Sequence, residues 1–531
     1  MDIGRSFDEL WGSLLPVGRD PRTGGYRRFA WSAADREARE WFHRAAAARG
    51  MPVEADRNGN LWAWWGEPRP GSVVTGSHLD SVPDGGPFDG PLGIVSAFCA
   101  IDLIHSRGMS QLAKSTSGND RADPPAGAAG GAEPRGRRPY GAGNRPTSAG
   151  DRSAGKARVD RRRSIAVVCF ADEEGARFGV ACAGSRLLTG ALDPNRARNL
   201  TDGDGVTLAE AMRSAGHDPG RLGRDDEALA RIGAFVELHI EQGRALADLG
   251  SPVGVGEGIW PHGRWRFDFA GHADHAGTTR LADRVDPMLA YAKAVLAGRE
   301  LAEQLGALAT FGKVAVEPNG TNAIPSLVRA WLDARAPDES TVEKLVTALA
   351  AGSGAAVERE SWSPAVRFDQ LLTARLVDVV THALSAPRPK PVAGSLAPNP
   401  LEQGTLLPPT LLEQGTLLPD TRRTVWGSDP TVGRRDPSAN QEQVEGALIP
   451  IRLEQGHLLP KRAGVVPVLA TGAGHDAGVL ASEVPAAMLF VRNPTGVSHS
   501  PAEHADRIDC IAGVVALAAV LDDLTTRPAD A

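Results

Sequence analysis

The sequence has few cysteines, no excess of basic residues and no long apolar run. Its 531 residues carry a formal net charge of -7, which argues against nucleic acid as a partner. No run of about 18 apolar residues occurs, so we expect no membrane span. MDIGRSFDEL shows no signal peptide, and we therefore expect a cytoplasmic protein. No CxxC pair indicates a thiolate zinc site or a disulfide framework among the four cysteines, Cys99, Cys169, Cys182 and Cys510.

Two segments differ from the rest of the chain in composition. Residues from about 110 to 163 are rich in Gly, Pro, Ala, Ser and Arg, and Tyr140 is their only aromatic residue. Residues 387–462 contain the octamer LEQGTLLP twice and LEQGHLLP once. Neither segment can bury enough apolar surface to offset its ordering entropy, so we predict two disordered insertions. The first segment ends in the Arg-rich sequence ARVDRRRS, so an alternative function is that of a scaffold protein whose insertion binds acidic partners.

The chain is too long for one ordinary domain, so we expect at least two. Residues 257–370 have a strand–helix–strand–strand–helix–strand pattern, which is typical of a ferredoxin-like α+β domain. Its first strand alternates Trp265, Phe267 and Phe269 with polar residues. Residues 1–256 and 371–531 are predicted to form a larger α/β domain around this insertion.

Polar side chains of the ligand type follow four apolar strands of the larger domain. Open α/β sheets place their sites beyond the carboxyl ends of such strands. The motifs are GSHLDSVPDGGPFDGPLG with His78, Asp80 and Asp89, FADEEG with Glu173 and Glu174, FVELHIEQG with His239 and Gln242, and LFVRNPTGVSHSPAEH with His499. Each motif alone commonly has a structural explanation, as solvated surface or as part of the core. Their joint occurrence at strand ends is what indicates a functional site.

Imidazoles and carboxylates in this combination suit zinc, manganese or cobalt. Five such ligands allow two divalent ions to share one carboxylate, an arrangement that activates a bridging water. In such a site the adjacent residues Glu173 and Glu174 would have different roles: one carboxylate binds metal, and its neighbour acts as general base.

The quartet HLDSVPDGGPFDG, ADEEGARFG, ELHIEQG and GVSHSPAE resembles the amidase, hydantoinase/carbamoylase family of dimetal hydrolases. DGVTLAEAM, GHADHAGTTRLADRVDP, PNGTNAIPS and TGAGHDA extend the resemblance over most of the chain outside the two insertions. It implies a dimetal aminopeptidase-like catalytic domain, with a mixed sheet flanked by helices. It also implies that residues 257–370 form a lid and dimerisation domain, and that the enzyme is a homodimer.

The resemblance assigns a role to each residue that matches the family motifs. Asp89 is expected to bridge two divalent ions. His78 and His239 should complete one metal site, and Glu174 and His499 the other.

Further roles concern the reaction and the substrate. Glu173 should act as general base, and Asp80 should orient His78. His275 should stabilise the oxyanion from the partner subunit, although Asp274 stands before it where the family often has Asn. The substrate contacts implied by the resemblance are Gln242, Asn322, Arg335, Gly474 and His475, with Arg335 pairing the substrate carboxylate.

We therefore expect a hydrolase of a linear ureido or carbamoyl carbon–nitrogen bond in a small carboxylate-bearing molecule. LLPVGRDPRTGGYRRFAWS and EGIWPHGRWRF resemble the allantoate branch, which favours allantoate amidohydrolase and a step of purine catabolism. N-carbamoyl-L-amino-acid hydrolase and beta-ureidopropionase remain alternatives, as does an aminoacylase or peptidase acting on an ordinary amide. A catalytically silent ligand-binding paralogue is disfavoured because every expected ligand and the base are present.

Overall fold

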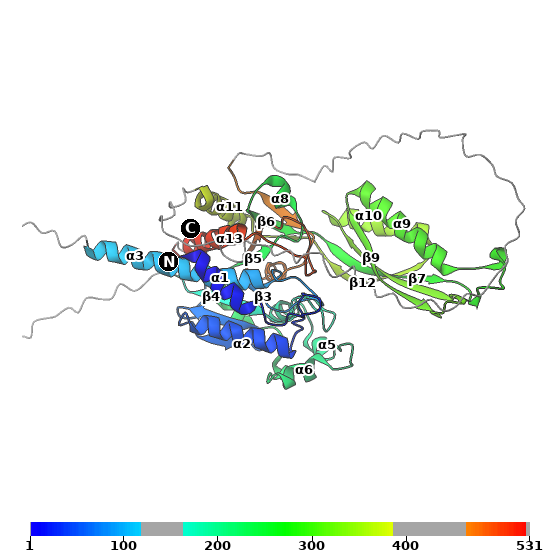
Figure 1. Cartoon of the computed structure of the whole chain (residues 1–531), viewed down its shortest axis with the longest axis horizontal. Helices are drawn as coiled ribbons and strands as arrows, with labels where there is room; N and C mark the ends of the chain where they lie inside the picture. The colour runs from blue at the N-terminus through cyan, green and yellow to red at the C-terminus, as the bar shows by residue number, and fades with distance from the viewer. Residues whose placement is uncertain (1, 118–162, 386–463, 527–531) are drawn as a thin grey trace, which may run out of the picture. The chain divides into compact units, whose positions relative to one another are not determined.

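The computed structural model of the protein describes residues 2–117, 163–385 and 464–526. Helix α3 (Pro91–Ser117) runs past residue 110, so the prediction of a disordered insertion is wrong for residues 110–117. The remainder of that segment, and residues 387–462, lie outside the described residues. The described strands form a nine-stranded sheet, a four-stranded sheet and a two-stranded ribbon (Figure 1).

The nine-stranded sheet has the order β1-β2-β4-β3-β5-β15-β6-β13, with β14 paired to β6. Its strands are β1 (Val53–Ala55), β2 (Leu61–Trp65), β3 (Ser72–His78), β4 (Ile165–Phe170), β5 (Ile232–Ile240), β6 (Val253–Ile259), β13 (Val366–Arg367), β14 (Val468–Thr471) and β15 (Ala486–Val491). The neighbours β4, β3, β5 and β15 are parallel, whereas β1, β2, β6 and β13 add antiparallel pairs. The sheet is therefore mixed, and its four central strands end at the same edge.

Helices cover both faces of this sheet. They are α1 (Ile3–Leu14), α2 (Ala33–Ala47), α3, α4 (Ala183–Thr189), α7 (Asp226–Arg231), α8 (Ala245–Leu249), α11 (Gln370–Ser385), α12 (Asp476–Leu480) and α13 (Arg507–Thr526). The short helices α5 (Pro194–Arg198) and α6 (Leu208–Ser214) pack in a separate apolar cluster, and η1 (Pro219–Arg221) lies next to α6. Val73 and Val167 belong to a core with α1, α2, α3, α11 and α13. Val74 and Val168 belong to a second core with α4, α7, α8 and α12. Successive strand residues point to opposite faces, so strands buried on both sides appear as continuous apolar runs.

A second group of elements, within residues 262–363, has the order strand–helix–strand–strand–helix–strand. Its members are β7 (His262–Ala270), α9 (Pro287–Leu305), β9 (Leu308–Glu317), β11 (Leu327–Arg335), α10 (Glu339–Ser353) and β12 (Ala356–Ser363). The strands are antiparallel in the order β12-β7-β11-β9. Phe267, Phe269 and Leu332 pack in one core with Ala294 of α9 and Leu345 of α10, so both helices cover one face (Figure 1).

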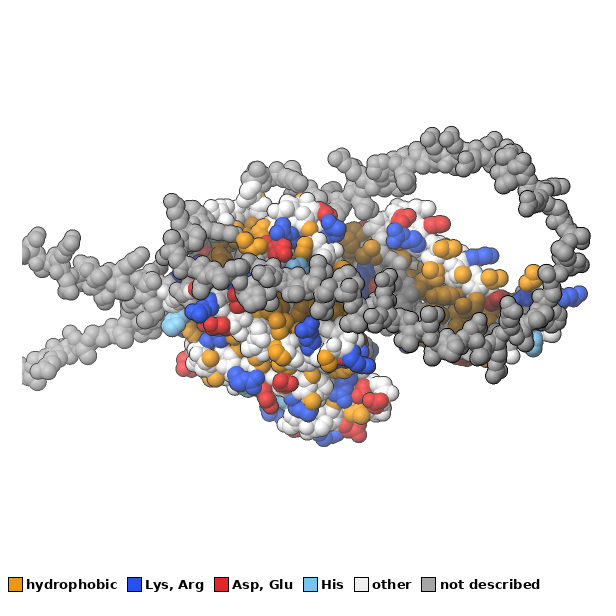
Figure 2. Space-filling model, viewed as in Figure 1, with side chains coloured by type: hydrophobic (Ala, Val, Ile, Leu, Met, Phe, Trp, Pro, Cys, Tyr) orange, Lys and Arg blue, Asp and Glu red, His pale blue; other side chains and the backbone are white. Residues whose placement is uncertain are grey.

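Positive and negative side chains are interspersed over the visible described surface in Figure 2. This distribution accompanies the modest net charge of -7. Within the described ranges, no helix combines the length and the apolar composition that crossing a membrane requires.

Candidate metal centre and active site

The carboxyl edge of the large sheet brings the four predicted motifs together. His78 is the last residue of β3, and His239 is the next to last residue of β5. Glu173 follows β4, His499 follows β15, and Asp89 stands just before α3. Because the parallel strands share one orientation, motifs far apart in the sequence meet at one edge.

A first group of ligand atoms consists of His78, Asp89 and His239. All three residues are buried, and their ligand atoms lie within 4.8 Å of one another. Oδ1 of Asp89 is 3.5 Å from Nε2 of His78 and 3.2 Å from Nε2 of His239. Two imidazoles and one carboxylate form a donor set suited to a divalent cation.

A second group consists of Asp89, Glu174 and His499, again with ligand atoms within 4.8 Å of one another. Nε2 of His499 lies 3.3 Å from Oδ2 of Asp89 and 3.6 Å from Oε2 of Glu174. The Asp89 carboxylate thus belongs to both groups and presents a different oxygen to each.

The hydrogen bonds of His78 and His239 leave a ring nitrogen of each for a cation. Nδ1 of His78 lies 3.2 Å from the carbonyl oxygen of Asp80, and Nδ1 of His239 lies 2.9 Å from that of Ile240. A carbonyl only accepts, so each neutral ring carries its proton on Nδ1, and the Nε2 lone pair lies on the side of Asp89, where a cation would bind.

Those lone pairs have no hydrogen-bond partner among the described residues. Nε2 of His78, Nε2 of His239 and Oε1 of Glu174 are buried and make no hydrogen bond. Leaving a buried polar atom unpaired costs about 1–3 kcal/mol. Acceptors that converge in this way fit a bound cation, so the residues present suit the metal centre that the sequence predicted.

Gly90 allows the loop before α3 to approach His78. Its φ of +83° lies in the left-handed region, and a Cβ there would stand 2.5 Å from Cε1 of His78. A side chain at position 90 would displace the imidazole, so glycine is needed next to Asp89.

Asp80 fixes the loop that carries the two glutamates. Its Oδ1 accepts the backbone N–H of Glu173 at 3.2 Å, and its Oδ2 accepts that of Glu174 at 3.0 Å. Oδ1 also lies 3.6 Å from Nδ1 of His78. Asp80 therefore contacts both the imidazole of His78 and the backbone of the glutamate pair, the kind of contact commonly found behind a metal ligand.

The side chain of Glu173 diverges from that of Glu174 and belongs to neither ligand group. Its Oε2 lies 3.6 Å from Nε2 of His78. Burial, assisted by the carboxylates of Asp476 and Glu174 and opposed by His78, raises the pKa of Glu173 well above its ordinary value. A carboxylate with a raised proton affinity beside the ligand groups is equipped to accept a proton.

Three predicted substrate contacts stand around these groups. Nε2 of Gln242 donates to Oδ2 of Asp89 at 2.8 Å. The ring of His475, which follows Gly474, lies 4.5 Å from the ring of His239. Burial and the neighbouring His239 lower the pKa of His475 well below its ordinary value, so this imidazole is neutral.

The other predicted contacts belong to the second group of elements. Arg335 ends β11, where its guanidinium donates to both oxygens of Asp333 and to the carbonyl oxygen of Gly472. His275 is exposed in β8 (Asp274–His275), which pairs with β10 (Ala323–Ile324) next to Asn322. Its Nδ1 accepts the backbone N–H of Gly277, so the proton resides on Nε2.

The structure does not bring these three residues into contact with the metal-ligand groups. Among the described residues, no hydrogen bond or ion pair joins His275, Asn322 or Arg335 to the groups around Asp89. Their roles in the reaction therefore stay predictions.

Two contacts of the site were missed by the sequence analysis. Oε2 of Glu503 accepts the backbone N–H groups of Phe88 and Asp89, at 2.9 and 3.1 Å. Its presence in the same motif as His499 was the available signal. The thiol of Cys182 donates to Oε1 of Glu173 at 3.2 Å, and nothing in the sequence pattern marked this contact.

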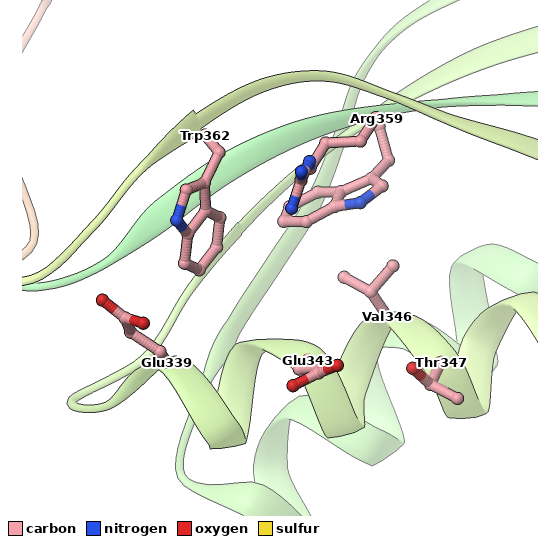
Figure 3. Close-up of a pocket in the computed structure, with 7 residues that line it drawn as sticks. Glu339, Glu343, Val346, Thr347, Arg359 and Trp362 are labelled. Atoms are coloured by element: carbon pink, nitrogen blue, oxygen red, sulfur yellow. The ribbon is translucent and has the colours of Figure 1, made fainter.

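A cavity of about 530 Å³ lies away from these residues, between α10 and the four-stranded sheet. Figure 3 shows Glu339 and Glu343 on the helix, opposite Arg359 and Trp362 of β12. Its lining contains none of the predicted site residues. We therefore place the candidate active site at the edge of the large sheet, where the two ligand groups lie.

Comparison with known proteins covers nearly the whole chain. It is 30% identical over 517 residues to an N-carbamoyl-L-amino acid amidohydrolase of Geobacillus stearothermophilus, covering 96% of each chain. It is 26% identical to an allantoate amidohydrolase of Escherichia coli, covering 98% of each. A hydantoinase/carbamoylase family amidase from Burkholderia vietnamiensis has the same fold, with a TM-score of 0.67 at 22% identity over 99% of this chain and 98% of that one. No family model matches the chain.

The mixed sheet, and the ligand groups at its edge, define an α/β protein with a candidate metal centre. With a relative at 30% identity over almost its full length, the chain belongs to the amidase, hydantoinase/carbamoylase family. The resemblance seen in the motifs of the sequence is thereby confirmed.

Proposed function

We propose that the protein is a dimetal amidohydrolase that cleaves a linear ureido carbon–nitrogen bond in a small carboxylate-bearing substrate. The observation that carries this proposal is the carboxylate of Asp89, which presents one oxygen to His78 and His239 and the other to His499. These residues, with Glu174, would hold two divalent ions such as zinc, manganese or cobalt. When bound, the ions would polarise the substrate and increase the acidity of water.

Glu173 moves the proton in this proposal. Its Oε2, on the side of His78, accepts a proton from the attacking water. The same carboxyl then delivers that proton to the leaving nitrogen as the carbon–nitrogen bond breaks. Asp80 keeps the base in place through its hydrogen bond to the backbone of Glu173.

Substrate contacts complete the site. Arg335 would pair with the substrate carboxylate, because its planar fork suits bidentate binding. His275, with its proton on Nε2, would donate to the oxyanion from a partner subunit. This assignment makes residues 257–370 a lid and dimerisation domain in a homodimer.

Allantoate is the substrate we favour, on the N-terminal and EGIWPHGRWRF segments that resemble the allantoate branch. Relatives at 26% identity in Escherichia coli and in Bacillus subtilis are named allantoate amidohydrolases. N-carbamoyl-L-amino acids are the second candidate, because the relative with 30% identity is named for that activity.

A matched pair of substrates tests the reaction class. N-carbamoyl-L-methionine and N-acetyl-L-methionine share the side chain and the carboxylate, and they differ in the bond that is hydrolysed. Assayed together with allantoate in the presence of manganese, zinc or cobalt, the ureido compounds should be turned over and the acetyl compound spared. Preferential release of methionine from N-acetyl-L-methionine would instead identify an aminoacylase.

A further inference from the structure

Cys182 contacts Glu173 through both its backbone and its side chain. Its N–H donates to the carbonyl oxygen of Glu173 at 2.5 Å, and its thiol lies 3.2 Å from Oε1 of the same residue. Only 3% of the cysteine is exposed. Among the described residues, this thiol is the one hydrogen-bond donor to the Glu173 carboxylate.

The backbone of Cys182 adopts a conformation that suits this contact. Its φ is +54°, in the left-handed region that residues other than glycine rarely adopt. It stands at the N-cap of α4, but its side chain makes no capping hydrogen bond. The thiol is directed to Glu173 instead, and the surrounding structure sustains the unusual backbone.

The thiol remains protonated in this environment. Burial, together with the negative charge of Glu173 and Asp476, raises the pKa of Cys182 well above its ordinary value. A protonated thiol can donate a hydrogen bond and a carboxylate can accept it. The contact therefore directs Oε1 of Glu173 to Cys182 and leaves Oε2 on the side of His78.

We infer that Cys182 is a positioning residue that holds the carboxylate of Glu173 for proton transfer. This inference rests on the proposed role of Glu173 as general base. Without a donor at position 182, the carboxylate gains rotational freedom, and a misplaced base transfers protons more slowly. The thiol acts through Glu173 and does not itself contact the substrate.

A simpler role would be that of a small apolar filler, as is common for buried cysteines. Cys510 offers a matched control, since it is a buried thiol in helix α13 that packs in the apolar core. If Cys182 only fills space, its replacement should lower thermal stability and leave turnover unchanged, which is the result expected for Cys510→Ala.

The test uses the metal-loaded enzyme and compares Cys182→Ala, Cys182→Ser and Cys510→Ala. We expect the alanine variant at position 182 to lose about 10-fold in kcat, less than the roughly 10²–10⁴-fold ascribed to a base itself. Its KM and metal content should stay at parent values. The serine variant, which keeps a donor, should recover most of the loss. Cys182→Gly gives a second variant without a donor that suits a positive φ, should the alanine variant fold poorly.

A double-mutant cycle separates positioning from packing. If Cys182 acts through the carboxylate of Glu173, Glu173→Gln combined with Cys182→Ala should be no slower than Glu173→Gln alone. Multiplied losses in the double variant, or equal kcat values for the serine and alanine variants, would overturn the inference. A Glu173→Gln enzyme that retains full turnover would instead refute the proposed base, and with it this inference. The hydrolase assignment would be unaffected, because the comparison of ureido and acetyl substrates tests it separately.

Discussion

The carboxylate of Asp80 accepts the backbone N–H of Glu174 over 3.0 Å, and its other oxygen accepts that of the preceding residue. One buried side chain thus fixes the backbone of an adjacent pair of glutamates, while their side chains diverge. Glu174 reaches His499, whereas Glu173 reaches His78 and Cys182. The two carboxylates consequently have separate partners, so substitutions at Glu173 and Glu174 should have different effects on the enzyme.

Glutamine substitutions, which remove the negative charge, should distinguish the roles of the two glutamates. Glu173→Gln should lower kcat by about 10²–10⁴-fold and leave the metal content intact, because it removes a proton acceptor and no ligand. Glu174→Gln should lose metal from one site. Metal analysis beside steady-state kinetics checks both, and the opposite pattern would show that the roles are exchanged.

Removing the two biased segments should preserve the chemistry. None of the predicted site residues lies in 110–163 or 387–462, and long insertions add little loop-closure entropy. A variant with short linkers in their place should retain the parent kcat. Circular dichroism provides the folding control. Loss of turnover in a well-folded deletion variant would assign these segments a part in catalysis.

Subunit mixing tests the predicted action of His275 across an interface. His275→Ala and Glu173→Gln should each be nearly inactive alone. If His275 serves the site of the partner subunit, mixed dimers contain one intact site and should recover part of the activity. Exchange must be proven with differently tagged subunits, and exchange without recovery would place His275 and Glu173 in the same subunit's site.

The substrate assignment predicts a ratio of specificities. A site built to bind the second ureido group of allantoate should discriminate strongly against molecules that lack it, because its polar groups would be left unpaired. The kcat/KM for allantoate should therefore exceed those for N-carbamoyl-L-methionine and N-carbamoyl-glycine. A higher value for either carbamoyl compound would replace allantoate without affecting the hydrolase class.

The parts of the site that follow strands were predictable from the sequence. Strands β3, β4 and β5 are buried on both faces and appear as apolar runs, so the polar residues that end them stand out. The position of His78 and His239 at one sheet edge then follows from the parallel arrangement.

Contacts that depend on loop conformation were not predictable. Glu503 meets the backbone of Asp89 across most of the chain length, and no periodicity connects them. Cys182 reaches Glu173 because its φ is positive, which residue preferences disfavour for cysteine. The extension of α3 to Ser117 was missed because the composition of residues beyond 110 outweighed the local helical pattern.

Metal titration of the stripped enzyme tests the central claim most directly. After chelation, the protein should release no ammonia from allantoate or N-carbamoyl amino acids, because the acceptors around Asp89 lack their cations. Activity should return with added manganese, zinc or cobalt and reach its maximum at two bound ions per subunit. Undiminished turnover by the metal-free protein would contradict the account.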